Sequence, residues 1–190
     1  MAWLFIVILL ILLWVVSLCK ILHASRSPSK VAFISNGEAV FHKRNILLVM
    51  AHPDDESMFF SPTVIYLASR LHSIHILCMS IGNADGKGSI RKEELYQACA
   101  VLKVPVQQVK ILDHPELQDG FDKMWSRNLL ARIIEQEISS HGIDLIITFD
   151  NYGVSGHRNH CDVHQGIWFR KLFVAFSSYT YVNTLRKISP

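Results

Sequence analysis

The chain has 190 residues, half of them hydrophobic, and a formal net charge of +3 with its ten histidines neutral. This length suits one α/β domain together with a membrane segment. The sequence has no dense run of basic residues, which argues against a nucleic-acid partner. The four cysteines form no CxxC pair and no regular framework, so we expect reduced and mostly buried thiols, as in a domain that faces the cytosol.

The first element is an unbroken apolar run from Ala2 to Cys19, in which Ser17 is a mild exception. About 18–20 such residues cross a hydrocarbon core of roughly 30 Å, so the run predicts a transmembrane anchor at residues 1–22. A cleaved signal peptide is the alternative, but it would carry positive charge before its apolar region. The basic residues here follow the run, and they are Lys20, Arg26, Lys30, Lys43 and Arg44. They predict that the remaining chain faces the cytosol and contacts anionic headgroups of the membrane.

Residues 23–44 are polar and mixed and predict a linker, and a regular pattern begins at Asn45. The run Ile46–Met50 is continuously apolar, which is typical of a buried parallel strand. Three further short segments rich in apolar residues also predict strands, and they are Ile74–Met79, Gln108–Leu112 and Leu145–Phe149. Three segments between them have helical periodicity, and they are Met58–Leu71, Ser89–Leu102 and Trp125–Ser140. This alternation predicts the α/β class, with a Rossmann-like parallel sheet that carries helices on both faces.

Polar side chains follow each predicted strand at its carboxyl end, where open parallel sheets bind their ligands. They are His52, Asp54 and Asp55 after the first strand, Ser80–Asn83 after the second, Asp113 and His114 after the third, and Asp150, His157 and His160 after the fourth. We therefore expect residues that are distant in the sequence to meet at one edge of the sheet.

Two motifs at this edge carry candidate chemistry, Ala51–Glu56 (AHPDDE) and Gly156–His160 (GHRNH). A catalytic zinc takes three protein ligands from histidine and carboxylate and keeps one position open for water. His52, one aspartate and one later histidine would supply such a set, and the second aspartate could take a proton from the water. The alternative is that the first motif only caps a helix and that the two histidines lie on a solvated face.

The segment Leu47–Glu56 (LLVMAHPDDE) resembles the signature of the LmbE-like, or PIG-L, deacetylase family. Further stretches of residues 45–164 are similar to the same family, and they are Met58–Thr63, Ser80–Asn83, Arg91–Leu95, Thr148–Asp150 and Gly153–His160. The resemblance implies a metal-dependent hydrolase that removes acetyl from N-acetylglucosaminyl-phosphatidylinositol, in the second step of glycosylphosphatidylinositol (GPI) anchor biosynthesis. It also implies a single-pass protein of the endoplasmic reticulum membrane, with its catalytic domain in the cytosol.

The resemblance implies roles for six residues: metal ligands His52, Asp55 and His160, general base Asp54, oxyanion-stabilising or proton-donating His157, and substrate-binding Arg91. The implied cofactor is Zn²⁺, although two histidines and one carboxylate also suit Fe²⁺. His164 lies four residues after His160 and is the alternative ligand. We expect it to be structural or solvated instead.

Family members continue beyond the second motif with a further helix, strand and loop. This chain instead passes into an aromatic tail at residues 165–190, so we expect a C-terminally incomplete deacetylase domain at residues 45–164. The tail would pack in the core or lie on the membrane surface. One alternative function is a catalytically inactive membrane protein that keeps the fold as an interaction module. Another is hydrolysis of a phosphoester, but such sites often use two metals and the sequence offers ligands for one.

Overall fold

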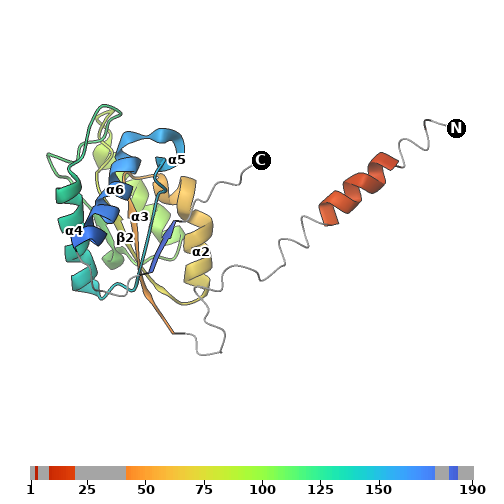
Figure 1. The fold of residues 1–190 in the computed structure, drawn as a ribbon, viewed down its shortest axis with the longest axis horizontal. Coiled ribbons are helices and arrows are strands. Elements are labelled where there is room, and N and C mark those ends of the chain that lie inside the picture. Colours follow the sequence, from red (N-terminus) through yellow and green to blue (C-terminus); the bar gives the residue numbers. More distant parts are fainter. Residues whose placement is uncertain (1–2, 4–8, 20–41, 174–179, 184–190) are drawn as a thin grey trace. The chain divides into compact units, whose positions relative to one another are not determined.

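The computed structural model describes residue 3 and residues 9–19, 42–173 and 180–183 (Figure 1). The chain divides into two compact units, Met1–His42 and Lys43–Pro190. In the first unit, residues 9–19 form a helix. Most of the predicted linker lies outside the described residues, as does part of the predicted anchor. Within the described ranges, no helix combines the length and the apolar character that crossing a membrane requires.

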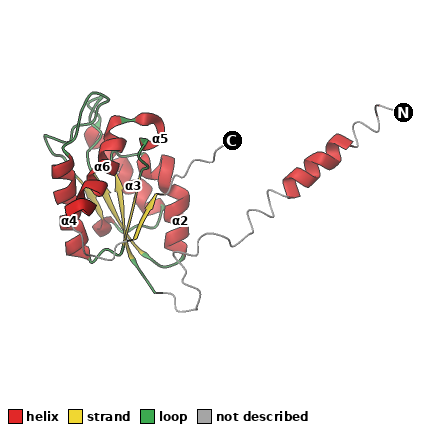
Figure 2. Ribbon diagram, viewed as in Figure 1, coloured by secondary structure: helices red, strands yellow, loops and turns green. Residues whose placement is uncertain are grey.

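The second unit is built on a five-stranded sheet in the order β3-β2-β1-β4-β5, with every neighbouring pair parallel (Figure 2). Its strands are β1 (Asn45–Met50), β2 (Ser73–Cys78), β3 (Val109–Ile111), β4 (Leu145–Thr148) and β5 (Thr180–Asn183). The apolar runs correctly predicted the first four strands and the parallel α/β class. The edge strand β5 was not predicted, because it follows the helical pattern of the tail with no separate apolar run.

Helices cover both faces of the sheet, as predicted: Figure 1 shows α4 and α6 on one side and α2 on the other. The helical elements are η1 (Glu56–Phe60), α2 (Ser61–Ser69), α3 (Gly88–Val101), η2 (Val106–Gln108), α4 (Arg127–His141), α5 (Gly153–Gly156) and α6 (Arg158–Phe173). The segment predicted as one helix at Met58–Leu71 is a π-helical turn, η1, followed by α2. Pro62 lies in the first turn of α2. Backbone N–H groups in a first turn have no acceptor within the helix, so the missing N–H of proline costs no hydrogen bond there.

The core lies between the sheet and its helices, and the central strand β1 is buried from Ile46 to Met50. Helix α4 ends at Gly142, whose φ of 56° is the left-handed conformation that glycine adopts without strain. Helix α6 continues without a break through residue 165 and packs against α4. Its first turn carries the last three residues of the second sequence motif, residues 158–160.

The contact between α4 and α6 depends on Gly166. A Cβ atom at this position would lie 2.6 Å from the Cβ of Leu130, closer than the two helices can tolerate without moving apart. A helical Gly→Ala change normally stabilises by up to about 1 kcal/mol. We expect Gly166→Ala to lower the free energy of unfolding instead, by about 1–3 kcal/mol, because it overpacks this interface. Urea unfolding measures the change, and unchanged or increased stability would contradict this account of the interface.

Candidate active site

The two sequence motifs meet at the carboxyl edge of the sheet. His52 lies just after β1, and His157 and His160 lie at the start of α6, which follows β4. The His52 ring centroid is 4.9 Å from that of His157 and 5.3 Å from that of His160. Thr148 holds the two strands together at this end by donating its hydroxyl to the Val49 carbonyl at 2.9 Å. The prediction that distant polar residues share one edge is confirmed for these residues.

Asp55 lies between the first and the last of the three histidines and is fully buried. Its Oδ2 accepts the backbone N–H groups of Ala51 and His52 at 3.0 and 2.8 Å and lies 4.0 Å from the His52 Nδ1. Its Oδ1 lies 3.2 Å from the Nε2 of His160. The carboxylate is thus fixed by the chain that follows β1 and directed at the helix that follows β4.

The tautomer of His160 makes this contact informative. The Nδ1 of His160 lies 3.2 Å from the Gly153 carbonyl, which can only accept, so Nδ1 carries the proton. In the neutral ring, the Nε2 lone pair then faces the Asp55 carboxylate at 3.2 Å. Two acceptors so close repel each other unless a proton or a cation lies between them. The residues present therefore fit a metal ion.

Two overlapping sets of side chains could hold such an ion. Candidate ligand atoms of His52, His157 and His160 all lie within 4.8 Å of one another. Asp55 contacts two of these histidines, which gives the set His52, Asp55 and His160 that the sequence predicted. Both sets offer three ligands from histidine or carboxylate, as catalytic zinc sites do.

His157 stands beside this cluster and is prepared to donate a proton. Its Nδ1 accepts the backbone N–H of Asn159 at 3.3 Å, so the neutral ring carries its proton on Nε2. Burial lowers the pKa of His157, and electrostatic interaction with the His52 and His160 rings lowers it further, while Asp119 and Asp55 partly offset this shift. The ring of Phe121 lies over it, with centroids 4.5 Å apart. A neutral donor at this place can hydrogen-bond a developing oxyanion.

Asp54 has a strained backbone and a carboxylate that reaches solvent. Its φ of 106° is rare for a residue with a side chain and costs about 1–3 kcal/mol. The buried Glu56 holds this conformation, because its Oε2 accepts the Asp54 N–H at 3.0 Å. Burial raises the pKa of Asp54, while the charge of Arg91 partly offsets this shift. A carboxylate with a raised pKa is a stronger proton acceptor.

Arg91 joins the first motif to the loop after β3. Its Nη2 donates to the Pro53 carbonyl at 2.7 Å and to Asp54 Oδ2 at 3.1 Å. Its Nη1 donates to the Gly82 carbonyl at 2.8 Å and to Asp119 Oδ2 at 3.2 Å. Four protein oxygens therefore engage the guanidinium, and in this structure Arg91 positions two carboxylates. The substrate contact predicted for it remains a prediction.

Sequence reasoning missed two residues that contact His52. Asp119 Oδ1 and Asn159 Oδ1 each lie 3.1 Å from the His52 Nε2. Burial alone would lower the pKa of His52, but Asp119 and Asp55 offset this effect and the pKa is raised. The hydrogen bond from His52 lowers the pKa of Asp119 to about 2. Asp119 lies in an irregular loop without periodicity, and Asn159 lies inside a motif in which only the histidines were assigned roles.

Asn159 is fully buried and ties α6 to that loop. Its Nδ2 donates to the Lys123 carbonyl at 2.8 Å and its Oδ1 accepts the Gly120 N–H at 3.3 Å. We expect Asn159→Ala to lower the free energy of unfolding by about 1–3 kcal/mol, because both loop groups lose their partner. Amide exchange at Gly120 should also become faster. The exposed Asn128 supplies a control, since Asn128→Ala should change stability by less than about 0.5 kcal/mol. Equal effects of the two changes would contradict this role.

His164, the alternative ligand, is buried and its Nδ1 donates to the Phe149 carbonyl at 2.9 Å. Its ring also packs near that of Trp168, with centroids 6.1 Å apart. His164 takes no part in the group of candidate metal ligands found within the described residues. These contacts agree with the structural role that was expected.

A sequence profile of the PIG-L family, described as GlcNAc-PI de-N-acetylase, matches residues 47–169. The chain belongs to the PIG-L family. Among its PIG-L relatives, a Schizosaccharomyces pombe protein named "Probable N-acetylglucosaminyl-phosphatidylinositol de-N-acetylase" is 45% identical over 134 residues, which are 70% of this chain and 54% of that protein. The N-acetylglucosaminyl-phosphatidylinositol de-N-acetylase of Bos taurus is 44% identical over 121 residues, 64% of this chain and 48% of the relative. The chain thus spans about half the length of these relatives.

Solved structures share the PIG-L fold of this chain. The N,N'-diacetylchitobiose deacetylase of Pyrococcus horikoshii has a TM-score of 0.61 at 16% identity, over 76% of this chain and 55% of that one. The 4-carboxy-2-hydroxymuconate hydratase GalB of Pseudomonas putida has a TM-score of 0.56 at 14% identity, over 72% of this chain and 59% of that one. Because a deacetylase and a hydratase share this fold, the fold alone does not identify the reaction.

Proposed function

We propose that this PIG-L chain hydrolyses the acetamide of N-acetylglucosaminyl-phosphatidylinositol and releases acetate and glucosaminyl-phosphatidylinositol, whose sugar then carries a free amine. The proposal assigns one divalent cation, Zn²⁺, to His52, Asp55 and His160. The observation that carries it is the contact of 3.2 Å between the Asp55 carboxylate and the Nε2 of His160, whose Nδ1 lies 3.2 Å from the Gly153 carbonyl. In the neutral tautomer, a cation held by this pair would relieve the repulsion between its two acceptors.

The reaction needs a proton acceptor and a proton donor on either side of the amide. When bound, the cation polarises the carbonyl oxygen and lowers the pKa of water from 15.7 to about 7. Asp54 accepts the proton of the attacking water, and Arg91 holds its carboxylate in place at 3.1 Å. His157 donates from Nε2 to the carbonyl oxygen as charge develops there. Asp54 then passes the proton that it took from the water to the glucosamine nitrogen, so that the C–N bond breaks and the nitrogen leaves as a neutral amine.

The substrate is proposed from the relatives, because the Schizosaccharomyces pombe and Bos taurus proteins carry N-acetylglucosaminyl-phosphatidylinositol in their names. On this proposal, the chain acts in GPI-anchor biosynthesis at the cytosolic face of the endoplasmic reticulum membrane. The apolar run Ala2–Cys19 and the basic residues after it support membrane anchoring in that orientation. Glycolipid and membrane are then the partners of the chain.

A second candidate function rests on the length of the chain. This candidate assumes that groups needed for turnover lie in the half of the relatives that the matched segment does not cover. A chain that keeps the fold and the ion but lacks those groups would be a catalytically inactive interaction module of the membrane. Both candidates predict that the chain binds a metal ion, but only the hydrolase predicts turnover of the substrate.

One assay separates the two candidates. The full chain, purified in detergent with Zn²⁺, is mixed with N-acetylglucosaminyl-phosphatidylinositol, and free amine is measured over time. Hydrolysis predicts amine release that a chelator stops and Zn²⁺ restores. A parallel chimaera carries, in addition, the parts of the Bos taurus relative that lie outside its matched 121 residues. Amine release by the chimaera alone, from a folded and metal-loaded parent chain, would contradict the hydrolase and support the inactive module.

A further inference from the structure

The loop that precedes α4 presents large apolar side chains to solvent beside the active site. We call residues 118–126 the mouth loop. Phe121 and Met124 are 77% and 71% exposed, although both belong to residue types that normally avoid water. The ring of Phe121 lies 4.5 Å from that of His157, so this apolar surface borders the catalytic cluster. A partner that covers the mouth loop therefore lies next to the place where the substrate binds.

The exposure of these side chains is built into the fold. Trp125 is buried and fixes the loop, because its backbone N–H donates to Asp162 Oδ2 at 2.9 Å and its indole Nε1 donates to the Gln118 carbonyl at 2.9 Å. Asn159 holds the Lys123 carbonyl from the opposite side. With both ends of the segment bound, Met124 cannot turn inward without breaking these contacts. An apolar surface held outward in this way indicates an apolar partner.

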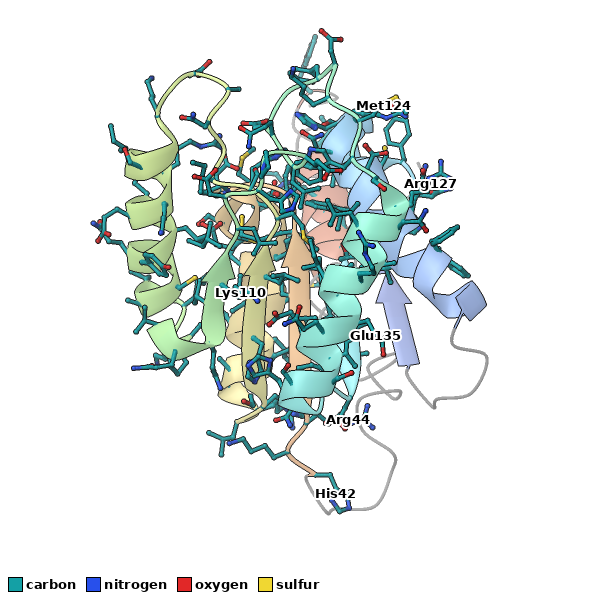
Figure 3. All side chains as sticks on the ribbon, turned by 90° about the vertical axis from the view of Figure 1, so that its left-hand side faces the viewer. His42, Arg44, Lys110, Met124, Arg127 and Glu135 are labelled. Atoms are coloured by element: carbon teal, nitrogen blue, oxygen red, sulfur yellow. The ribbon has the colours of Figure 1, made fainter. Side chains whose placement is uncertain are left out.

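The charges around the mouth loop favour an anionic partner. Lys123 and Arg127 are exposed on either side of Met124. Arg158, which forms an ion pair with Asp162, is partly exposed next to the loop. Asp122 is the exposed carboxylate of the same stretch. Figure 3 shows Met124 and Arg127 together at one end of the domain and Arg44, which precedes β1, at the other. Basic groups beside exposed apolar side chains are typical of surfaces that bind anionic lipid.

We propose that the mouth loop is a membrane-contact surface, in which Phe121 and Met124 enter the headgroup region of an anionic bilayer and Lys123 and Arg127 contact its phosphates. This inference rests on the proposed function, because a glycolipid substrate fixes the distance between the site and the bilayer. The acyl chains of the glycolipid stay in the membrane, so the acetamide of the same molecule lies no farther from the bilayer than the length of its headgroup. The catalytic mouth must then lie at the membrane surface, where an apolar and basic rim contributes to binding.

A depth measurement on the full chain tests the surface without reference to activity. An environment-sensitive fluorophore is attached through Met124→Cys, or through Val101→Cys as the control, in a background with Cys19→Ser and Cys161→Ser. Cys78 and Cys99 are buried, and burial raises the pKa of both thiols, that of Cys99 to about 12, so they stay unlabelled. Val101 is 81% exposed but ends α3, whose direction places it at the opposite edge of the sheet. The chain is reconstituted in phosphatidylcholine and phosphatidylserine vesicles that contain nitroxide-labelled acyl chains.

The nitroxide lipids should quench the label at position 124 at least about twofold more than the label at position 101. Equal quenching, or none, overturns the proposal, and a protein partner would give that result. A second readout compares Met124→Asp with Val101→Asp on vesicle-borne glycolipid and on the soluble N-acetylglucosaminyl-inositol headgroup. Met124→Asp should lower turnover of the vesicle-borne substrate about tenfold and leave the soluble one unchanged. If no variant or parent chain hydrolyses either substrate, the proposed function fails, while selective quenching at position 124 still supports the contact surface.

Discussion

Asp54→Asn is expected to lower the rate of amide hydrolysis by about 100–10,000-fold, the usual contribution of a general base. The amide side chain keeps the shape of the carboxylate and can still contact Arg91, but it cannot accept a proton. The fold and the bound ion should be retained, because Asp54 lies outside the proposed ligand set. Amine release under saturating substrate, measured together with metal content, gives both quantities.

The exposed Glu93 on α3 provides a control for this prediction. Glu93→Gln likewise replaces a carboxylate by an amide and should change the rate less than about twofold, since exposed substitutions away from functional features have small effects. An Asp54→Asn variant that retains full activity would show that another group takes the proton. The Asp119 carboxylate, 3.1 Å from His52, would then be the first alternative to examine.

His160→Ala is expected to weaken metal binding more than about 100-fold, beyond the 10–100-fold loss typical when a residue that only orients a ligand is removed. The buried Asp55 carboxylate would at the same time lose the ring nitrogen that lies 3.2 Å from its Oδ1. His157→Ala should instead keep the ion and lose turnover, because we assign His157 to the reacting oxygen. Competition for Zn²⁺ with a chromophoric chelator measures the affinity of each variant.

The two possible ligand sets predict different results in this experiment. If His157→Ala loses the ion as completely as His160→Ala, and Asp55→Asn keeps it, the three histidines hold the metal. That result would overturn the assignment of Asp55 as a ligand and of His157 as a donor. Circular dichroism of each variant establishes that the loss does not come from unfolding.

The sequence predicts the strands of this fold well because their signal is local. Runs such as Ile46–Met50 and Leu145–Phe149 are apolar throughout, and a continuous apolar stretch has few other stable places in an α/β domain. The transition from η1 to α2 was not predicted, because apolar spacing does not distinguish a π-helical turn from an α-helical one. It places Glu56 beside Asp54, and only the folded backbone shows that contact.

The candidate site was predictable where it consists of motif residues at strand ends. His52, Asp55 and His160 could be placed at one edge from the order of the strands alone. The roles of Asp119 and Asn159 could not, because both depend on how a loop without periodicity folds back over β1. The contact between His52 and Asn159 joins residues 107 positions apart, and no local pattern encodes it. The four acceptors of Arg91 are likewise a tertiary property.

The central claim is that one cation joins the turn after β1 to the start of α6. Metal analysis of the full chain, purified in folded form and freed of loosely bound ions by gel filtration, tests it most directly. We predict about one divalent ion per chain, with zinc preferred over iron in a competition. Folded chain that binds no divalent ion, even with Zn²⁺ supplied, would contradict both the site and the hydrolysis assigned to it.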